Sequence, residues 1–501
     1  MKSIWNWPKL LLNVCLFCMA SQSSFGQSDN YWSWNSNTHS TLLAGAVVGG
    51  LSGPSSIFYN PALFNHENLP SLSVSANLLS FQFYKVENLA GDNLTADDFL
   101  FKVQPRFISY VLPTANKRIG IQFALMSPSS ECIAYAAQYE TELDLIKRTA
   151  GLETYNGYLS YNRQFDDTWG GVGISYELSD GLYVGSSMFV SYKSMDLVSF
   201  QSAEAFQMSD SVSVGDNLQP RYISTSGSEE DFSYWYYSAI FKIGLQYTLK
   251  NERLSLGLNM TMPNIPLYGE ADVRKRFYRS NIYDNTTGDF VTNENTLGAQ
   301  EQSSVRVKSP FSVAFGGAYY FKKKTNVLLF TAEYFSPVDA YNLVDSDQQA
   351  NWLPGPVDQN QTEQSFMTYS SRARPVTNVA IGYKNVISEK LAFLGGVRTD
   401  FTNGNQEDKR YVDGNFGVNQ IHMSKWHISS GFLVEIGRFK VLTGLQYTYA
   451  RAQDLLQATN YTDPVEYNPI SGQSLDGTRE RVASAALNEL TLFFGLSISG
   501  K

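Results

Sequence analysis

Apolar and polar residues alternate over many short stretches of the chain. Between residues 237 and 249 every second side chain is apolar, and the side chains between them are mostly polar or small. Residues 118–125, 253–262 and 489–498 repeat this pattern. Because consecutive side chains of a β-strand point to opposite faces, a period of two predicts strands with one apolar and one polar face. The chain is therefore predicted to be all-β.

The alternating stretches predict about fourteen strands. They begin near residues 71, 104, 117, 168, 181, 232, 253, 303, 325, 373, 390, 425, 439 and 484. Short polar turns and long polar connections follow each other in strict order along the chain. The short turns lie at residues 113–117, 179–180, 250–252, 322–324, 386–389 and 437–438, and the long connections lie near residues 85–103, 127–167, 195–231, 263–302, 336–372, 402–424 and 450–483.

This order of the connections decides between two architectures. A soluble sandwich also alternates, with its apolar face inward, but nothing requires its connections to alternate in length. Outer-membrane barrels join their strands by short periplasmic turns and long extracellular loops, and an even strand number brings both chain ends to the periplasmic side. Closure also removes the sheet edges, which lipid cannot hydrogen-bond. We therefore predict a transmembrane antiparallel β-barrel over residues 71–501.

Composition excludes two other classes of protein. The chain has 501 residues with 43% hydrophobic content, and past residue 20 no apolar run is long enough for a spanning helix, which excludes a helical membrane protein. The formal net charge is −9, so no basic face is available to neutralise phosphates and no nucleic-acid partner is expected. The 31 Tyr, 31 Phe and 8 Trp suit the aromatic girdles at the two membrane interfaces.

The first 26 residues have the layout of a secretory signal peptide. Lys2 and Lys9 precede an apolar core of about eleven residues, shorter than the roughly 20 that a spanning helix needs, and small residues lead to Gly26. We expect cleavage after Gly26 and export to the outer membrane of a Gram-negative cell. Cleavage leaves Cys132 as the one cysteine, so neither a disulfide framework nor a thiolate metal site is expected.

Residues 27–70 fit no strand. A small, Gly-rich run at residues 41–54 is followed by Ser55-Ser56-Ile57-Phe58-Tyr59-Asn60-Pro61-Ala62-Leu63. Gly permits tight turns and Pro ends helices, so this segment is predicted to be compact and irregular. A barrel of about fourteen strands encloses a lumen too wide for its own side chains to fill. We therefore predict that residues 27–70 form an N-terminal hatch that plugs the lumen.

The Asn60-Pro61-Ala62 motif, just before the first predicted strand, resembles the hatch motif of the FadL-type long-chain fatty acid transporter family. The resemblance continues into residues 105–113, and fourteen strands are also that family's number. It implies passive uptake of hydrophobic compounds such as long-chain fatty acids, gated by the hatch, in a Bacteroidetes-like member. Two departures are Gly53-Pro54-Ser55, which replaces the acidic pair of many members, and a C-terminus of Ser499-Gly500-Lys501 without an aromatic residue.

Two basic groups are candidates for contact with the hatch or a ligand. Alternation directs five cations near the periplasmic turns toward the lumen: Arg118, Lys242, Arg253, Lys384 and Lys440. They either hold the hatch and guide a carboxylate or pair with Glu177, Glu435 and Glu489 on the same wall. A second basic run lies in an extracellular connection, as a solvated loop or an attractant for anions: Arg274, Lys275, Arg276 and Arg279.

The residues suggest no enzyme, cofactor or metal site. None of the four histidines, His39, His66, His422 and His427, lies beside a recognisable Ser nucleophile motif. Two functions stay open. One is uptake of a hydrophobic small molecule through a barrel in contact with outer-membrane lipid. The other follows from FadL-like barrels of the Bacteroidetes that act as structural or shuttle partners in protein assemblies such as type IX secretion, because the long loops can equally bind a protein.

Overall fold

The computed structural model describes residues 29–498, apart from residues 34–36, 65–69, 149, 210, 215–216, 251, 322–324, 345–350, 353–366 and 405–420. The predicted signal peptide lies outside these residues. Four short helices come first: α2 (Thr38–Leu42), η1 (Gly53–Ser55), α3 (Ser56–Tyr59) and η2 (Pro61–Phe64). No helix in the described part of the chain has the length and apolar character needed to cross a membrane.

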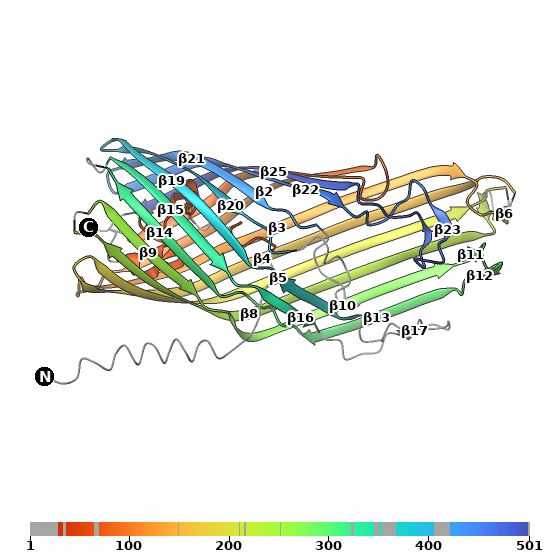
Figure 1. Cartoon of the computed structure of the whole chain (residues 1–501), viewed down its shortest axis with the longest axis horizontal. Coiled ribbons are helices and arrows are strands. Elements are labelled where there is room, and N and C mark those ends of the chain that lie inside the picture. The colour runs from red at the N-terminus through yellow and green to blue at the C-terminus, as the bar shows by residue number, and fades with distance from the viewer. Residues whose placement is uncertain are drawn as a thin grey trace.

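The described strands close into an antiparallel barrel (Figure 1). The chain passes along the barrel wall fourteen times, and we call each passage a crossing. Twelve crossings are β1 (Leu72–Glu87), β2 (Thr95–Leu112), β3 (Ile119–Leu143), β4 (Glu153–Ser179), β5 (Leu182–Phe206), β8 (Ile223–Thr248), β15 (Asn326–Phe335), β19 (Val376–Ser388), β20 (Leu391–Asp400), β21 (Lys425–Ile436), β22 (Phe439–Leu455) and β25 (Ala483–Ile498). The other two are β9 (Leu254–Thr261) with β10 (Ile265–Ser280), and β13 (Glu294–Ser304) with β14 (Ser312–Tyr320). Pairing of β1 with β25 closes the ring. Each crossing corresponds to one predicted strand.

The remaining short strands lie in the long connections. They are β6 (Ser211–Val214), β7 (Asn217–Pro220), β11 (Tyr283–Asp284), β12 (Asp289–Phe290), β16 (Val338–Val344), β17 (Asn351–Trp352), β18 (Tyr369–Ala373), β23 (Val465–Tyr467) and β24 (Ser474–Asp476). Figure 1 shows β6, β11, β12 and β23 at the end of the barrel opposite the short turns. The order of short turns and long connections is therefore that of the sequence prediction.

Several predicted connections are much shorter in the structure, and this part of the prediction was wrong. β3 continues to Leu143 and β4 begins at Glu153, so the predicted connection 127–167 shrinks to residues 144–152. The basic run at residues 274–279 likewise lies in β10 and not in a loop. Outside the membrane the outward face of a strand meets water, so the apolar half of the alternation disappears while the hydrogen-bonded ladder continues. The hydrophobic pattern therefore ended before the strands did.

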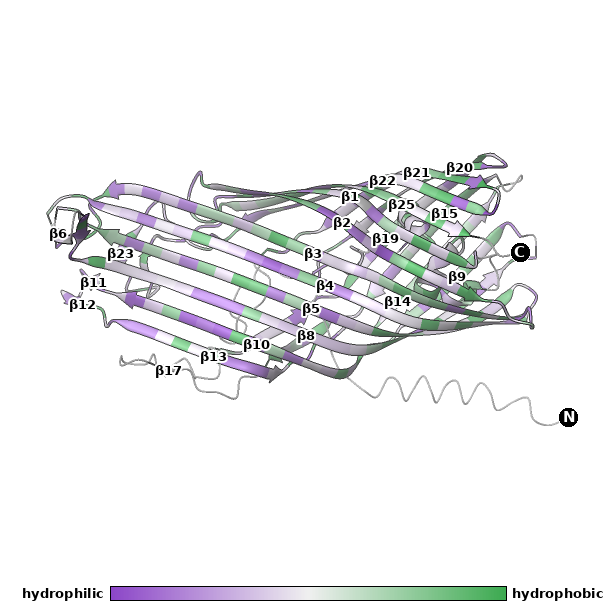
Figure 2. Cartoon of the chain, turned by 180° about the vertical axis from the view of Figure 1, so that it is seen from behind, coloured by the Kyte–Doolittle hydropathy of each residue, from purple (hydrophilic) through white to green (hydrophobic). Residues whose placement is uncertain are grey.

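Side-chain burial in the barrel is the reverse of that in a soluble sandwich. On β8 the polar side chains of Ser238 and Gln246 are fully buried, whereas Ile243 and Leu245 between them are exposed. The same inversion recurs around the barrel, where many large apolar residues are exposed. Figure 2 shows that hydrophobic residues concentrate in the strands toward the end with the short turns. On β4 beyond this band the exposed residues include the polar Asn162 and Gln164. An apolar outer belt around a polar lumen confirms the predicted membrane barrel.

Beyond the membrane, the ends of the long strands and the long connections pack together into a structure that we call the cap. Crossing a bilayer takes roughly 9 to 11 tilted residues, and β4 has 27. Inward side chains beyond the membrane, such as Tyr155 and Leu159, are buried against Tyr461 and Leu475 from the connection between β22 and β25. The cap therefore has a hydrophobic core of its own.

Arg148 joins four of the connections in this cap. Its guanidinium group forms an ion pair with Glu466 and a hydrogen bond with the Tyr222 hydroxyl. The rings of Tyr283 and Phe290 lie 5.2 and 4.8 Å from its guanidinium carbon. Cation–π contacts of this kind and a desolvated ion pair bind most tightly when several elements hold them in place. Arg148 therefore holds these connections of the cap together.

The apolar belt predicts a position-dependent cost for an added charge. We expect Ile174→Lys, in the middle of the exposed apolar positions of β4, to lower the free energy of unfolding in lipid vesicles by roughly 2 to 4 kcal/mol. Asn162→Lys, on the exposed outer face of the same strand beyond the belt, should change it by less than about 0.5 kcal/mol. Urea titration followed by gel mobility measures both, and equal effects would contradict the assigned belt.

The cap predicts that one cation holds several connections. We expect Arg148→Leu to increase hydrogen exchange in residues 281–293 and 456–482 at least tenfold, because it leaves the buried Glu466 carboxylate without its cationic partner. Lys147→Leu is the matched control, since Lys147 is exposed and pairs with the exposed Asp144. Hydrogen exchange read by mass spectrometry decides, and similar profiles for the two variants would show that Arg148 holds nothing.

Candidate functional site

The N-terminal segment, residues 29–64, lies inside the barrel near the end with the short turns (Figure 1). Ten inward glycines let it approach the wall, and we call them the glycine ring. At each one, an added Cβ would come within 3.0 Å of an atom of the segment: Gly173, Gly185, Gly244, Gly257, Gly316, Gly382, Gly396, Gly431, Gly444 and Gly495. Eight of them form cross-strand pairs: Gly185 with Gly244, Gly257 with Gly316, Gly382 with Gly396, and Gly431 with Gly444. The segment therefore packs directly against the backbone of the wall at these positions.

Asn60 of the Asn60-Pro61-Ala62 motif links the segment to itself and to the wall. The Asn60 side-chain Nδ2 donates to the Val48 carbonyl at 2.9 Å and to Gln246 Oε1 of β8 at 3.0 Å, while Oδ1 accepts from the Ala62 N–H at 3.1 Å. Pro61 begins η2, where a missing N–H costs nothing. Gln246 also donates to the Gly49 carbonyl at 2.9 Å. The motif is therefore the point at which the segment turns and attaches to the barrel.

The five basic lumenal candidates have different environments in the structure. Only Lys242 is fully buried against the segment, where its ammonium lies 4.4 Å from the Phe58 ring centroid and donates to Thr261. Lys384 and Lys440 are half-buried, and Lys440 pairs with Glu435 at 3.2 Å. Arg118 and Arg253 are exposed beside their turns. The five cations therefore do not form one cluster.

Two of the five cations, Lys384 and Lys440, nevertheless influence the N-terminal segment electrostatically. Burial, followed by the positive charges of Lys384 and Lys440, lowers the pKa of His39 to about 3. The His39 imidazole is therefore neutral at pH 7. At the start of the segment, burial opposes ionisation of Asp29, but the charges of His422, Arg163 and Lys425 outweigh it and lower the Asp29 pKa below its ordinary value. The segment thus presents one neutral and one anionic group to a charged lumen.

The second basic run is built into the wall of the cap. Lys275 is buried with its ammonium 3.8 Å from the centroid of the Tyr369 ring. Arg276 pairs with Glu229 at 3.4 Å, and Arg279 pairs with Glu294 at 3.0 Å. In these contacts the three cations interact with other residues of the protein. Arg274 is exposed on the same strand. The run therefore lies in a strand and not in a solvated loop, and three of its four cations have partners within the protein.

An apolar pocket of about 690 Å³ lies on the lumenal side of the segment. Tyr31 of the segment stacks on Phe335 with ring centroids 4.5 Å apart, and Trp169 lies 5.5 Å from Phe58. Phe165 and Ile240 add buried apolar surface, and the other lining residues include Met262, Val307 and the Asp167–Lys193 ion pair. Ligand pockets are typically apolar concavities with few polar groups. This cavity therefore suits a hydrophobic molecule.

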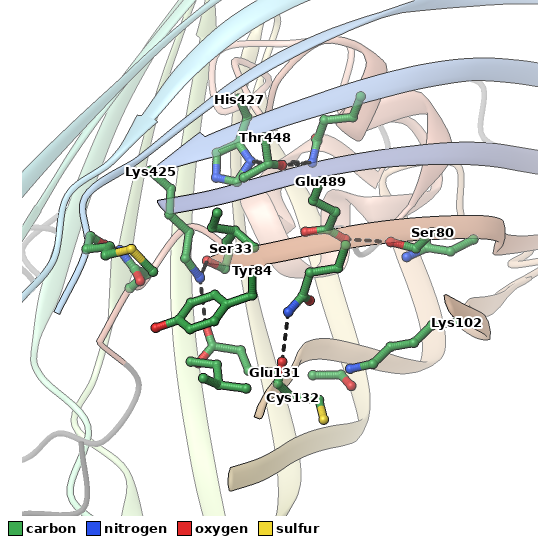
Figure 3. Close-up of a pocket in the computed structure, with 18 of the residues that line it drawn as sticks. Ser33, Ser80, Tyr84, Lys102, Glu131, Cys132, Lys425, His427, Thr448 and Glu489 are labelled. Atoms are coloured by element: carbon green, nitrogen blue, oxygen red, sulfur yellow. Dashed lines mark hydrogen bonds and ion pairs between the residues drawn. The ribbon is translucent and has the colours of Figure 1, made fainter. Parts of the chain in front are cut away.

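A second, polar pocket of about 890 Å³ lies between β1, β2, β3 and the β21–β22–β25 wall (Figure 3). Within it Lys425 donates to Glu131 at 2.8 Å and to Ser33 at 3.0 Å. Glu489 accepts from Ser80 at 2.6 Å, as Figure 3 shows. The two pockets therefore offer different chemistry within one lumen.

The wall beside the polar pocket is incompletely paired. β2 pairs with β3 only between Phe107–Leu112 and Ile121–Met126. Beyond this point β3 has a register irregularity between Met126 and Ser129, and among the described strands its upper part pairs with β4 alone. Side chains partly bridge the two strands: Arg106 donates to the Ser127 carbonyl at 3.2 Å, and Gln82 of β1 donates to the Cys132 carbonyl at 2.9 Å.

These features define the class of the protein as an outer-membrane β-barrel whose lumen holds its own N-terminal segment. The structure is similar to that of the P. putida toluene transporter TodX, with a TM-score of 0.50 and 12% identity over 93% of this chain and 98% of that one. At this identity the likeness shows the fold, and it confirms the sequence resemblance to FadL-type barrels at that level. No protein-family model matches the chain, and no curated protein does.

Two further solved structures are similar at lower scores. The Ralstonia pickettii toluene transporter TbuX has a TM-score of 0.48 and 12% identity over 92% of this chain and 98% of that one. A Pseudomonas aeruginosa FadL homologue has a TM-score of 0.45 and 12% identity over 94% of this chain and 99% of that one.

The sequence prediction missed the residues of both pockets. Trp169 and Phe165 lie on the inward face of β4, among Asp167, Gly171 and Ser175. Aromatic residues on an otherwise polar or small face are the signal that could have indicated a lumenal apolar site. Tyr31 and Phe335 gave no such signal, because only the fold brings them together.

The glycine ring predicts opposite outcomes for two adjacent substitutions in β14. A Cβ at Gly316 would lie 2.6 Å from the Gly49 nitrogen, whereas a Cβ at Gly317 would meet nothing closer than 3.7 Å. We expect Gly316→Ala to destabilise the seating of the segment by about 1 to 3 kcal/mol, seen as faster hydrogen exchange over residues 38–64. Gly317→Ala should leave that exchange unchanged. A segment equally protected in both variants would contradict the seating described above.

Proposed function

We propose that this protein carries hydrophobic compounds passively across the outer membrane. The observation that supports this most is the apolar pocket, which a membrane barrel does not need for its own stability. An apolar molecule gains roughly 25 cal/mol per Å² of apolar surface on leaving water. Occupation of the pocket therefore needs no energy source.

In this proposal the N-terminal segment is a hatch that controls passage. Tyr31 and Phe58 belong to the segment and contact the pocket residues Phe335 and Trp169, so movement of the segment would change the pocket. Buried charges at the level of the segment, Lys242, Glu333 and Arg398, oppose a straight route for an apolar molecule. Among the basic candidates, Lys242 is placed to hold the hatch through Phe58.

Long-chain fatty acids are one class of cargo in this proposal, and aromatic hydrocarbons are another. Both present apolar surface that fits between Phe165, Trp169 and Ile240. The export route assumed is a signal peptide cleaved after Gly26, which leaves a hatch over residues 27–70 ahead of the barrel. TodX is a toluene transporter, and an aromatic hydrocarbon is therefore included among the proposed cargoes.

Purification in a mild nonionic detergent, followed by extraction and mass spectrometry, tests the proposal. Transport predicts a fatty acid or another apolar molecule that copurifies with the protein at near-stoichiometric amounts. Stoichiometric protein partners with no apolar molecule bound would overturn the proposal and favour the alternative of a subunit in a secretion assembly.

A charge placed in the apolar pocket predicts loss of binding. We expect Met262→Glu to weaken binding of toluene and of a long-chain alcohol at least roughly tenfold, because the ligand would displace water from a carboxylate. Met208→Glu makes the same chemical change at an exposed position of the β5–β6 connection and should have no effect. Equilibrium dialysis with radiolabelled ligands measures both, and equal affinity for the two variants would place the ligand elsewhere.

A further inference from the structure

We infer that the apolar pocket selects an uncharged molecule that carries a hydroxyl group, such as a phenol or an alcohol. This inference deepens the proposed function and rests on it. The residues that would receive the hydroxyl group are Ser129 of β3, Asp167 of β4 and Lys193 of β5, and we call them the polar corner of the pocket. None of them is among the candidates that the sequence suggests.

Cross-strand register places the three residues of the polar corner side by side. Ser129 pairs with Asp167, and Asp167 pairs with Lys193. Residues directly opposite each other on neighbouring strands lie on the same face, with their Cβ atoms about 4.5 to 5.5 Å apart. All three line the pocket and are buried. The polar corner is therefore one continuous patch of the inner wall.

The charges of the polar corner balance each other. Lys193 forms an ion pair with one Asp167 carboxylate oxygen, and the Ser191 hydroxyl donates to the other at 2.8 Å. Lys308, which also lines the pocket, has its ammonium group 4.4 Å from the centroid of the Tyr341 ring. A carboxylate ligand would add a negative charge beside Asp167 in a largely apolar cavity, and burial of an uncompensated charge is costly. The pocket therefore disfavours an anion.

Two hydroxyl groups of the pocket have unused hydrogen-bonding capacity. The Ser129 and Tyr31 hydroxyls are buried, and neither has a hydrogen-bond partner among the described residues. Their chain neighbours Ser130 and Asn30 line the polar pocket, so both residues lie at the side of the apolar pocket that faces the polar one. Buried polar groups without partners are uncommon in native proteins. A polar group on the ligand would supply the missing partner.

A hydroxyl group matches the polar corner because it both donates and accepts hydrogen bonds. Its O–H can donate to Asp167, since a carboxylate has about four lone-pair sites, and its oxygen can accept from Ser129 or Lys193. Phe165 and Trp169 lie two residues before and after Asp167 on the same face of β4 and line the pocket. These rings would hold the apolar part of the ligand. A pure hydrocarbon would leave the polar corner without a partner.

Equilibrium dialysis of the full-length protein in a nonionic detergent tests the inference. The probes are radiolabelled p-cresol, toluene and 4-methylbenzoate at pH 7, where the phenol is uncharged and the benzoate is an anion. Each affinity is referred to the partition of the probe into protein-free micelles. We expect p-cresol to be favoured over toluene roughly tenfold, as two hydrogen bonds allow. 4-Methylbenzoate should bind at least roughly tenfold more weakly than p-cresol.

Variants of the ion pair show whether the polar corner causes this preference. Asp167→Leu with Lys193→Met leaves no buried charge unpaired, so it should fold, abolish the advantage of p-cresol and leave toluene binding equal or tighter. Asp167→Asn leaves Lys193 without its counter-charge, so 4-methylbenzoate should gain at least roughly tenfold in affinity. Asp166→Asn, on the opposite face of β4, is the matched control and should change no affinity. The slower gel mobility of each variant after boiling checks that its barrel is folded.

Four results would overturn the inference. They are equal affinities of p-cresol and toluene for the unchanged protein, an advantage of p-cresol that survives in the double variant, binding of 4-methylbenzoate to the unchanged protein as tight as that of p-cresol, and an unchanged affinity of the folded Asp167→Asn variant for 4-methylbenzoate. In each case toluene binding would still support the proposed function. Failure of all three probes and of a long-chain alcohol to bind would instead reject the proposed function itself.

Discussion

In lipid a strand can satisfy its backbone N–H and C=O groups only through neighbouring strands, and the rest of this structure depends on that constraint. It closes the sheet through the β1–β25 ladder. Fourteen strands then enclose a lumen too wide for their own side chains, and the N-terminal segment fills the space. The glycine ring allows it to do so, because ten wall positions lack the Cβ that would push the segment away. Barrel closure and seating of the segment are therefore one packing problem.

The packing of the N-terminal segment inside the barrel also determines where the two pockets lie. Tyr31 comes from the segment and lines a cavity whose walls include β4, β8 and β15, and Phe58 of the segment contacts the lining residue Trp169. The polar pocket lies where β2 and β3 stop pairing, and here a lumenal cavity is lined by both sides of an unpaired wall. The apolar pocket therefore borders the N-terminal segment, and the polar pocket lies at a break in the wall.

Sequence patterns predicted the barrel well, because the alternation of apolar and polar residues is a direct record of which face meets lipid. They also placed Gly244, Gly257 and Gly495 on the polar face, although only the structure shows that these glycines form a ring. The patterns failed beyond the membrane, where β3 and β4 continue without an apolar outer face. They also failed for contacts such as Tyr31 with Phe335, because such pairs depend on how distant strands are arranged around the lumen.

In the proposed function an apolar compound occupies the lumen between the N-terminal segment and the barrel wall. A crystal structure of the protein with a brominated long-chain ligand, phased with the anomalous signal of bromine, tests it most directly. We expect a bromine peak in the pocket between Trp169 and Phe335. Bromine density confined to the outer lipid-facing belt, with none in the lumen, would contradict it.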